Sequence, residues 1–414
     1  MSLALPLELL APAGGEEQLR AAVRFGADAV YLAGPRWGMR ARAQNFREEQ
    51  LADAVAMAHA KGVTVHVTLN TLMYDHDIGE LPQYLRLLED IGVDAVIVAD
   101  LGAMELVRKH APSVALHVST QASVTNASAA LAYVRLGACR IVLARELTLP
   151  QIAELHKRVG NSVELEAFVH GAMCMAVSGR CLLSSALVGL DRAASCGSCT
   201  QPCRWTWSLV EETRPNAPMP IEADERGSYL LSANDLCMID HLGDLAEAGI
   251  SSIKIEGRNK GAYYVAAVVN AYRHVLDGGD PKFWMAELEA TSHRPFSTGF
   301  YFGNPTQNPG HSEYARDRTL VAVACGSEET SEDVGQPQWL STVVCRNRAL
   351  VGEAVVVLSP GHPVRTFMLD GVERLMPDGV WQRVDRLSVN MEEYRMLTPF
   401  PLSQGDMLCV EASA

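Results

Sequence analysis

The sequence predicts an α/β fold in which eight parallel strands and their helices form a (β/α)8, TIM-barrel-like core, followed by a small β-barrel-like domain. Short apolar runs alternate with amphipathic, helix-like segments from residue 7 to about residue 273, and strands of a covered parallel sheet read as continuous apolar runs. The phrase Gly-Ala-Asp-Ala-Val at residues 26–30 recurs as Gly-Val-Asp-Ala-Val at residues 92–96, which indicates a repeated βα unit. Eight such runs favour a closed barrel over a doubly wound sheet, which is the alternative.

Each predicted strand is a short apolar run, and each predicted helix places its apolar residues on one face. The strands are expected at residues 7–13, 28–34, 63–72, 94–100, 114–121, 140–145, 163–170 and 250–258. Helices are expected at residues 16–25, 48–60, 81–91, 127–136 and 152–159. Glycines close several helical segments, as expected of a position that needs a positive φ, and these are Gly26, Gly62, Gly92, Gly137 and Gly249.

The regular spacing fails once, between the seventh and eighth strands, where about residues 174–239 form a cysteine-rich insertion. A hairpin of residues 205–212 with residues 228–232 is expected within it. Loops that follow barrel strands lie at the C-terminal face, where the active sites of such barrels are found. Residues 1–310 are expected to form the barrel domain and residues 316–414 a β domain joined by Gly, Pro and Asp turns. Its strands are expected at residues 320–324, 339–346, 353–358, 380–387 and 407–410.

The composition is acidic, with 35 Lys and Arg against 49 Asp and Glu among 414 residues and a formal net charge of −14. Proteins that bind nucleic acid mainly through its phosphates usually carry the opposite sign, so contact with RNA would require a local basic patch. No apolar run reaches the roughly 18 residues that span a bilayer, and the N-terminus lacks the cationic start of a secretory signal. We therefore expect a soluble cytoplasmic protein without membrane contact.

Five of the ten cysteines lie within the insertion, at Cys174, Cys181, Cys196, Cys199 and Cys203. In a reducing compartment, clustered cysteines are more often metal ligands or catalytic groups than disulfides. Zinc sites usually take pairs separated by two residues, a spacing found here once, whereas thiolates at irregular gaps favour a 4Fe–4S cluster, with zinc as the alternative. The other cysteines lie singly in apolar runs and are expected to be buried, free thiols: Cys139, Cys237, Cys325, Cys345 and Cys409.

Several segments are recognisable as motifs. Around the cysteines they are Glu-Ala-Phe-Val-His-Gly-Ala-Met-Cys at 166–174, Ser-Gly-Arg-Cys at 178–181 and Gly-Ser-Cys-Thr-Gln-Pro-Cys-Arg at 197–204. Elsewhere they are Leu-Leu-Ala-Pro-Ala-Gly at 9–14, Ser-Thr-Gln at 119–121, Lys-Ile-Glu-Gly-Arg at 254–258 and Ser-Thr-Gly-Phe-Tyr-Phe-Gly at 297–303. Together they closely resemble the signature of peptidase family U-32, the collagenase-like family of undefined catalytic type. The resemblance extends over about residues 5–310.

The resemblance implies a function that differs from the family name. Some members are named as proteases without agreed catalytic residues, whereas other relatives are oxygen-independent hydroxylases that hold a 4Fe–4S cluster. Those act on the wobble uridine of tRNA, on a cytidine of ribosomal RNA or on the ubiquinone ring, and prephenate is implicated as the oxygen source of the RNA-acting members. Structured RNA is thus the implied partner. The cluster ligands carried over by the resemblance are Cys174, Cys181, Cys199 and Cys203, with Cys196 as an alternative to Cys199.

Polar residues at the ends of the predicted strands are the candidates for the reaction itself, because these ends meet at the barrel mouth. The candidate catalytic residues are Asn70, Gln121, His170, Glu256 and Arg258. Further cations, suited to an anionic cosubstrate or to RNA, are Arg145, Arg180 and Lys254. The structural reading of the same residues is a polar layer with ordinary salt bridges.

Three hypotheses follow from the sequence. The leading one is an iron–sulfur enzyme that hydroxylates an RNA base without molecular oxygen. The second is a collagenase-like peptidase, although the sequence has neither a Gly-x-Ser-x-Gly elbow nor a His-Glu-x-x-His zinc helix. Cys174 and His170 would then act as nucleophile and base, in competition with the cluster for the same sulfur. The third is a non-catalytic RNA-binding or assembly protein in which the metal has a structural role and holds the insertion together.

Overall fold

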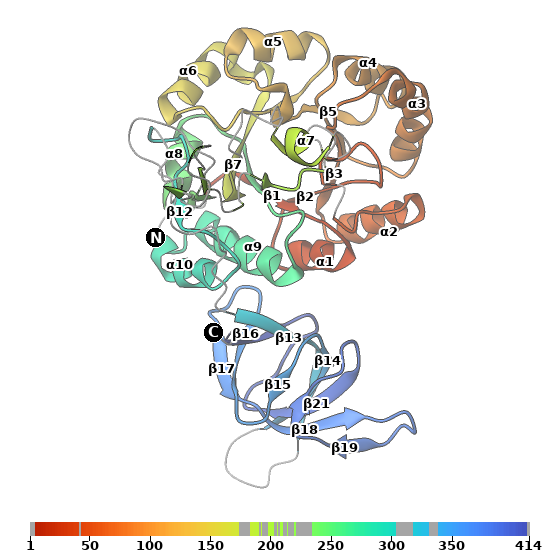
Figure 1. Cartoon of the computed structure of the whole chain (residues 1–414), viewed down its shortest axis with the longest axis vertical. Helices are drawn as coiled ribbons and strands as arrows, with labels where there is room; N and C mark the ends of the chain where they lie inside the picture. Colours follow the sequence, from red (N-terminus) through yellow and green to blue (C-terminus); the bar gives the residue numbers. More distant parts are fainter. Residues whose placement is uncertain are drawn as a thin grey trace.

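The chain is described by a computed structural model, in which a ring of strands and helices stands above a separate antiparallel sheet (Figure 1). The described residues are 5–40, 43–173, 183–189, 234–303, 318–330 and 338–411, together with 192, 198–202, 205, 208–209, 213 and 219–220. Among them, none of the helices combines the length and the apolar character needed to cross a membrane.

Eight parallel strands close into a barrel, so the predicted (β/α)8 core is confirmed. Strands β1 to β7 are neighbours in sequence order, and β11 closes the ring by pairing with both β7 and β1. The strands are β1 (Glu8–Pro12), β2 (Ala29–Leu32), β3 (Thr64–Leu69), β4 (Ala95–Val98), β5 (Ala115–Val118), β6 (Arg140–Val142), β7 (Glu164–Ala172) and β11 (Ser252–Ile255). Each overlaps one of the apolar runs identified in the sequence.

Helices surround the ring of strands (Figure 1). They are α1 (Glu16–Arg24), α2 (Glu48–His59), α3 (Asp75–Asp90), α4 (Leu101–His110), α5 (Ala127–Arg135), α6 (Leu149–Val159), α8 (Leu242–Glu247), α9 (Ala262–Leu276) and α10 (Pro281–Glu289). The five glycines predicted to close helical segments all have positive φ, between 73° and 100°. The predicted start of α3 at residue 81 is wrong, because the helix begins at Asp75 and contains Pro82 in its interior. Asp77 caps the N-terminus of this helix, because its carboxylate accepts a hydrogen bond from the Tyr74 amide at 3.0 Å.

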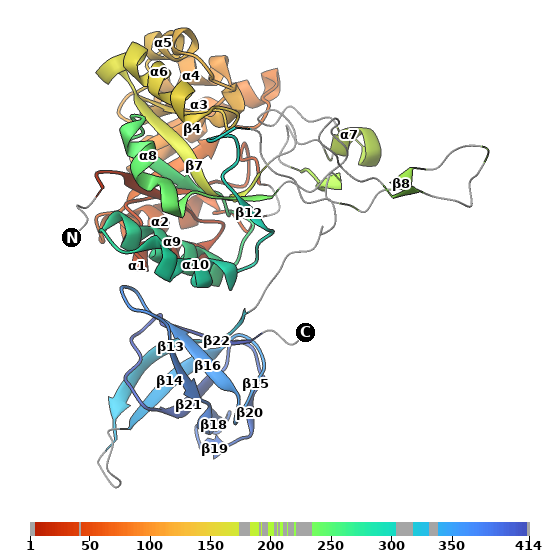
Figure 2. The same ribbon diagram turned by 90° about the vertical axis from the view of Figure 1, so that its left-hand side faces the viewer.

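The insertion leaves the barrel from an extension of β7. Beyond the ring, β7 pairs antiparallel with β10 (Asp235–Cys237), which in turn pairs with β12 (Phe296–Ser297). The short helix α7 (Leu183–Val188) projects from this end of the barrel (Figure 2). Strand β8 (Ser208–Leu209) falls in the predicted hairpin but pairs with β9 (Met219–Pro220), and the predicted second strand at 228–232 lies outside the described residues.

The C-terminal strands form an antiparallel half-barrel, as the β pattern predicted. One sheet has the order β17-β16-β22-β13-β14-β21-β18-β19, and β15 pairs with β20. The strands are β13 (Arg318–Glu329), β14 (Trp339–Cys345), β15 (Ala349–Leu350), β16 (Ala354–Leu358), β17 (Arg365–Met368), β18 (Asp370–Leu375), β19 (Trp381–Arg383), β20 (Arg386–Leu387), β21 (Glu393–Thr398) and β22 (Met407–Glu411). Ion pairs join this sheet to α1 and α10, including Arg24–Asp406 at 2.5 Å and Arg318–Glu287 at 2.6 Å.

Candidate active site

A small pocket opens at the C-terminal mouth of the barrel, with a volume of about 50 Å³. Its walls come from strands β2 to β4, β6, β7 and β11 and from connections that follow the barrel strands. Six of the side chains proposed from the sequence line it together: Asn70, Gln121, Arg145, Lys254, Glu256 and Arg258. The topology thus brings to one point residues that are as much as 188 positions apart, counted from 70 to 258. The reactions assigned to them stay predictions.

The pocket is cationic although the chain as a whole is acidic. Four cationic side chains line it against the single carboxylate of Glu256. That carboxylate accepts a hydrogen bond from Arg40 at 3.1 Å and lies 3.7 Å from the Arg145 guanidinium. Burial alone would raise the pKa of Glu256, but these two guanidinium groups outweigh it and hold the pKa below the usual value. Glu256 is therefore ionised at neutral pH.

Arg258 is a buried cation without a carboxylate partner among the described residues. It is 3% exposed, and its guanidinium donates to the neutral oxygens of Thr68, at 3.0 Å, and Asn45. Its Nε has no hydrogen-bond partner. Burial lowers the pKa of Arg258 to about 10. A buried charge is costly unless it is paired, so this arrangement is typical of a site that receives an anion.

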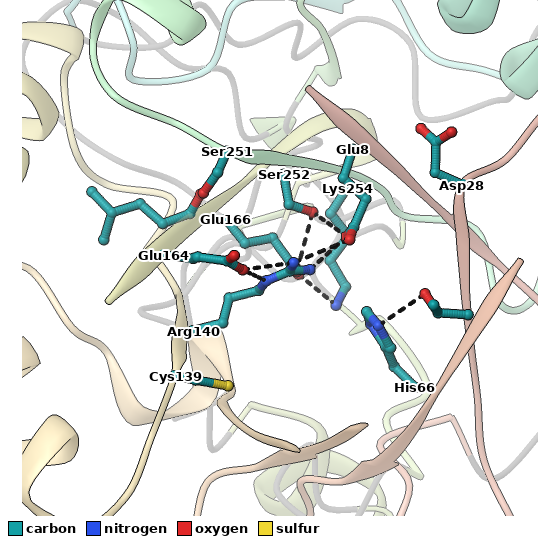
Figure 3. Close-up of polar contacts among 12 residues, drawn as sticks. Glu8, Asp28, His66, Cys139, Arg140, Glu164, Glu166, Ser251, Ser252 and Lys254 are labelled. Atoms are coloured by element: carbon teal, nitrogen blue, oxygen red, sulfur yellow. Dashed lines mark hydrogen bonds and ion pairs between the residues drawn. The ribbon is translucent and has the colours of Figure 1, made fainter. Parts of the chain in front are cut away.

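Lys254 belongs to a buried ionic network that fills the barrel below the pocket (Figure 3). Its ammonium donates to Glu166 at 2.9 Å and lies 4.3 Å from the centre of the Tyr31 ring. Below it, Arg140 contacts Glu8 and Glu166, and the Ser252 hydroxyl donates to Glu8 at 2.9 Å. The carboxylate of Glu166 is fully buried between the two cations. Lys254 is thus fixed from below while it lines the pocket above.

Arg40 was not among the residues proposed from the sequence. It lies in the connection between β2 and α2, which shows no periodicity, and two residues with positive φ flank it: Trp37 at 62° and Asn45 at 53°. Such backbone is uncommon for a bulky side chain. The Trp37 carbonyl is held by the Asn70 amide at 2.8 Å, and the Asn45 side-chain amide donates to the Arg40 carbonyl at 3.2 Å. The length of this connection at the barrel mouth was the only available signal.

The sequence suggested that the His170 side chain faces the barrel mouth, but in the structure it does not. The pairing of β7 with β11 shifts register at this point, so that Phe168 pairs with Lys254 but His170 pairs with Ile255. A one-residue slip moves a side chain to the other face of the sheet. The imidazole therefore lies outside the barrel wall, 3.3 Å from the Tyr272 hydroxyl. Burial lowers the pKa of His170 to about 3.

The described residues include one of the four predicted cluster ligands, Cys199, and among them no group of His, Cys, Asp or Glu is arranged to hold a metal ion. The other three ligands, Arg180 and Cys196 lie outside the described part. Cys199 is a half-buried free thiol whose sulfur accepts a hydrogen bond from the Gln201 amide at 3.3 Å. Beside it, Thr200 donates to the hydroxyl of Ser184 at 3.0 Å. This joins the segment of Cys199 to the segment that follows Cys181.

The single cysteines are only partly as predicted. In the described part of the chain Cys237, Cys345 and Cys409 are buried and form no disulfide, whereas Cys139 and Cys325 are exposed. Cys139 stands just before the first residue of β6, where the strand emerges from the barrel floor.

Comparison with known proteins gives a consistent family assignment. The sequence matches the family model of Peptidase family U32 over residues 14–310. It is 40% identical to tRNA hydroxylation protein P1 of Bacillus subtilis, covering 79% of each chain. It is 37% identical to the 23S rRNA 5-hydroxycytidine C2501 synthase of Escherichia coli, covering 70% of this chain and 44% of that protein. It is 34% identical to a collagenase of Porphyromonas gingivalis, covering 72% of this chain and 73% of that protein.

Proposed function

The chain belongs to peptidase family U32, and from this premise we propose that it is an iron–sulfur enzyme that hydroxylates a base of tRNA without molecular oxygen. The observation that carries the proposal is the cationic pocket at the barrel mouth, with the buried Arg258, which forms no ion pair with a carboxylate in the described part of the chain. The positive charge of this pocket favours an anionic ligand, such as a cosubstrate with carboxylate groups. An enzyme acting on tRNA would work in the cytoplasm.

The oxygen donor that the family resemblance implies is prephenate, which carries two carboxylates. A volume of about 50 Å³ holds about four water-sized groups, enough for one carboxylate, with the rest of the molecule toward the open mouth. Arg258 and Arg145 would bind the carboxylate as charge-assisted donors. Asn70 and Gln121 would donate hydrogen bonds beside them. Glu256, held ionised, would orient Arg40 and accept a hydrogen bond rather than donate a proton.

The cluster ligands are proposed to be Cys174, Cys181, Cys199 and Cys203, with Cys196 as the alternative to Cys199. Soft thiolates suit iron–sulfur clusters, and the free thiol of Cys199 with its amide hydrogen bond fits this use. A bound 4Fe–4S cluster would supply one-electron chemistry at the mouth, with a potential set by hydrogen bonds and solvent exposure. The pocket residues would bind the anion, exclude water and position the target base.

Transfer RNA is favoured over ribosomal RNA by the extent of similarity. The tRNA hydroxylation protein is matched over 79% of its length, whereas the rRNA hydroxycytidine synthase is matched over 44%. Peptidase activity is the second candidate, supported by the relative named collagenase. It would need a base beside a cysteine, and His170 lies outside the barrel wall with a pKa of about 3, which makes it a poor base. The third reading, a metal-stapled RNA-binding protein, predicts RNA binding without any modified nucleoside.

The test combines metal analysis with nucleoside analysis. Protein purified without oxygen should contain about four irons per chain, and the hydroxylated nucleoside should disappear from tRNA of a deletion strain. Complementation with Arg258→Gln should fail to restore it while the iron content stays normal, and the control Arg20→Gln, an exposed residue of α1, should restore it. One zinc or no metal, or full activity of Arg258→Gln, would contradict the proposal. Gelatin cleavage by the purified protein would favour the peptidase instead.

A further inference from the structure

Large apolar side chains are exposed around the barrel mouth. Leu72 and Tyr74, after β3, are 52% and 55% exposed, and Leu101, after β4, is 56% exposed. These connections lie at the same end of the barrel as the cationic pocket, because they follow the C-terminal ends of parallel strands. Exposed apolar groups gathered beside a site usually mark an interaction surface.

Within this rim, two aromatic rings form a stacked pair that faces solvent. The rings of Tyr74 and His76 are 5.9 Å apart and inclined by only 8°, and the His76 side chain is 72% exposed. Asp77 fixes the pair from below, since its carboxylate accepts hydrogen bonds from the Tyr74 amide at 3.0 Å and from the Trp37 indole at 2.9 Å. The guanidinium of Arg36, 49% exposed, lies 4.3 Å above the Trp37 ring and forms an ion pair with Glu80. Asp77 therefore holds both the backbone of the ring pair and the Trp37 ring on which Arg36 lies.

The ring pair is joined closely to the pocket. Asn70 lines the pocket, and Tyr74 follows it by four residues, which limits their separation to about 14 Å. The Trp37 carbonyl accepts hydrogen bonds from the amides of Asn70 and Thr71, at 2.8 and 3.1 Å. A ligand that reaches the pocket would therefore pass or touch this rim.

We propose that Tyr74 and His76 form a stacking platform for a nucleobase next to the target base of the RNA substrate, an inference that rests on the proposed function. Every base has a face that stacks on aromatic rings, and single-stranded RNA loops are commonly recognised this way. The charge also fits, because four cations and one carboxylate line the neighbouring pocket, which favours the phosphates of an RNA strand. An apolar peptide would gain nothing from those cations, so RNA is the favoured occupant.

The test is the affinity of the full-length protein for a fluorescent, unmodified anticodon stem-loop, measured by anisotropy. Tyr74→Ala should weaken binding by roughly fivefold to a hundredfold, the range of base–aromatic stacking. Tyr74→Phe should bind like the original, and Tyr74→Leu, which keeps apolar area without a ring, should be weakened. The matched control is Phe283→Ala, since Phe283 is 56% exposed but lies on α10, across the ring from α3 (Figure 1).

The outcomes separate this inference from the proposed function. Unchanged affinity of Tyr74→Ala, with an unchanged melting temperature, would overturn the platform, while hydroxylated tRNA in the complemented strain would leave the function standing. Equal weakening by Tyr74→Ala and Phe283→Ala would also overturn it. Loss of binding to a collagen-like peptide in Tyr74→Ala, with RNA binding intact, would assign the surface to a protein instead. Absence of RNA binding by the original protein would refute both proposals.

Discussion

Acid should destabilise the barrel through His170, which is buried in its neutral form. The side chain is 1% exposed, and burial lowers its pKa from 6.5 to about 3. The unfolded chain therefore takes up a proton at a higher pH than the folded chain does, so the free energy of unfolding decreases as the pH falls. The contribution is fully present above pH 6.5 and is lost progressively toward pH 3.

The magnitude follows from the two pKa values. Each pH unit between them costs about 1.4 kcal/mol, so the change from pH 8 to pH 5 should lower the free energy of unfolding by about 2 kcal/mol through this residue alone. His170→Phe keeps an aromatic ring packed against Tyr272 and Phe296 and removes the titration. Between pH 8 and pH 5, the free energy of unfolding of the variant should therefore fall by about 2 kcal/mol less than that of the original protein.

Urea-induced unfolding of the full-length chain, followed by tryptophan fluorescence at pH 8, 7, 6 and 5, measures this difference. The other buried histidines titrate in both proteins, so they cancel in the comparison. His362→Phe, at an exposed position, is the control and should keep the original pH dependence. If His170→Phe loses as much stability as the original protein between pH 8 and pH 5, the imidazole is not held neutral by burial and the reasoning fails.

Three further predictions test the network, the backbone and the pocket. Glu166→Gln should cost about 3–5 kcal/mol of stability because it leaves two buried cations without their shared carboxylate, whereas Glu164→Gln, 55% exposed, should cost less than about 1 kcal/mol. Gly171→Ala combines a φ of 101° with a Cβ that would lie 2.4 Å from a backbone oxygen and should cost about 2–5 kcal/mol. Gly62→Ala, with a φ of 73° and open space, should cost only about 1–2 kcal/mol. Arg258→Met should keep or raise the melting temperature while it abolishes the proposed tRNA hydroxylation, because it removes a buried charge that pairs with no carboxylate among the described residues.

Chemical unfolding at pH 7.5 measures the first two comparisons, and thermal unfolding with nucleoside analysis measures the third. Equal costs of Glu166→Gln and Glu164→Gln would contradict the buried network. Equal costs at the two glycines would mean that the close approach at residue 171 is relieved without strain. A large loss of stability in Arg258→Met would mean that this guanidinium serves the fold rather than a ligand.

The sequence was informative about the barrel because its signals are local and repeated. A buried parallel strand must be apolar, and a helix that ends on a positive φ favours glycine, so both can be recognised without tertiary contacts. The start of α3 was missed because Pro82 resembles a first-turn proline, whereas the fold tolerates it inside the helix. In the C-terminal sheet strands β17, β18 and β21 were not recognised, since they are at most six residues long and place charged residues among their apolar ones.

The site was predictable where residues stand at strand ends. The barrel topology alone brings Asn70, Gln121 and Glu256 to one mouth. Arg40 was missed because its place depends on hydrogen bonds made by an irregular connection, and such contacts leave no periodic signal. His170 was misplaced because a single register shift between β7 and β11 decides which face it occupies, and that shift depends on the pairing rather than on the residue types.

The β7–β10 ladder has a consequence for how such proteins diversify. Ala172 pairs with Asp235, so the chain departs from the barrel and rejoins it at neighbouring points, about 5 Å apart. Everything between them can lengthen, shorten or be exchanged over evolutionary time without displacing a single barrel strand. The same barrel could then carry different insertions between β7 and β10. This would let one fold serve relatives with names as different as hydroxylation protein and collagenase.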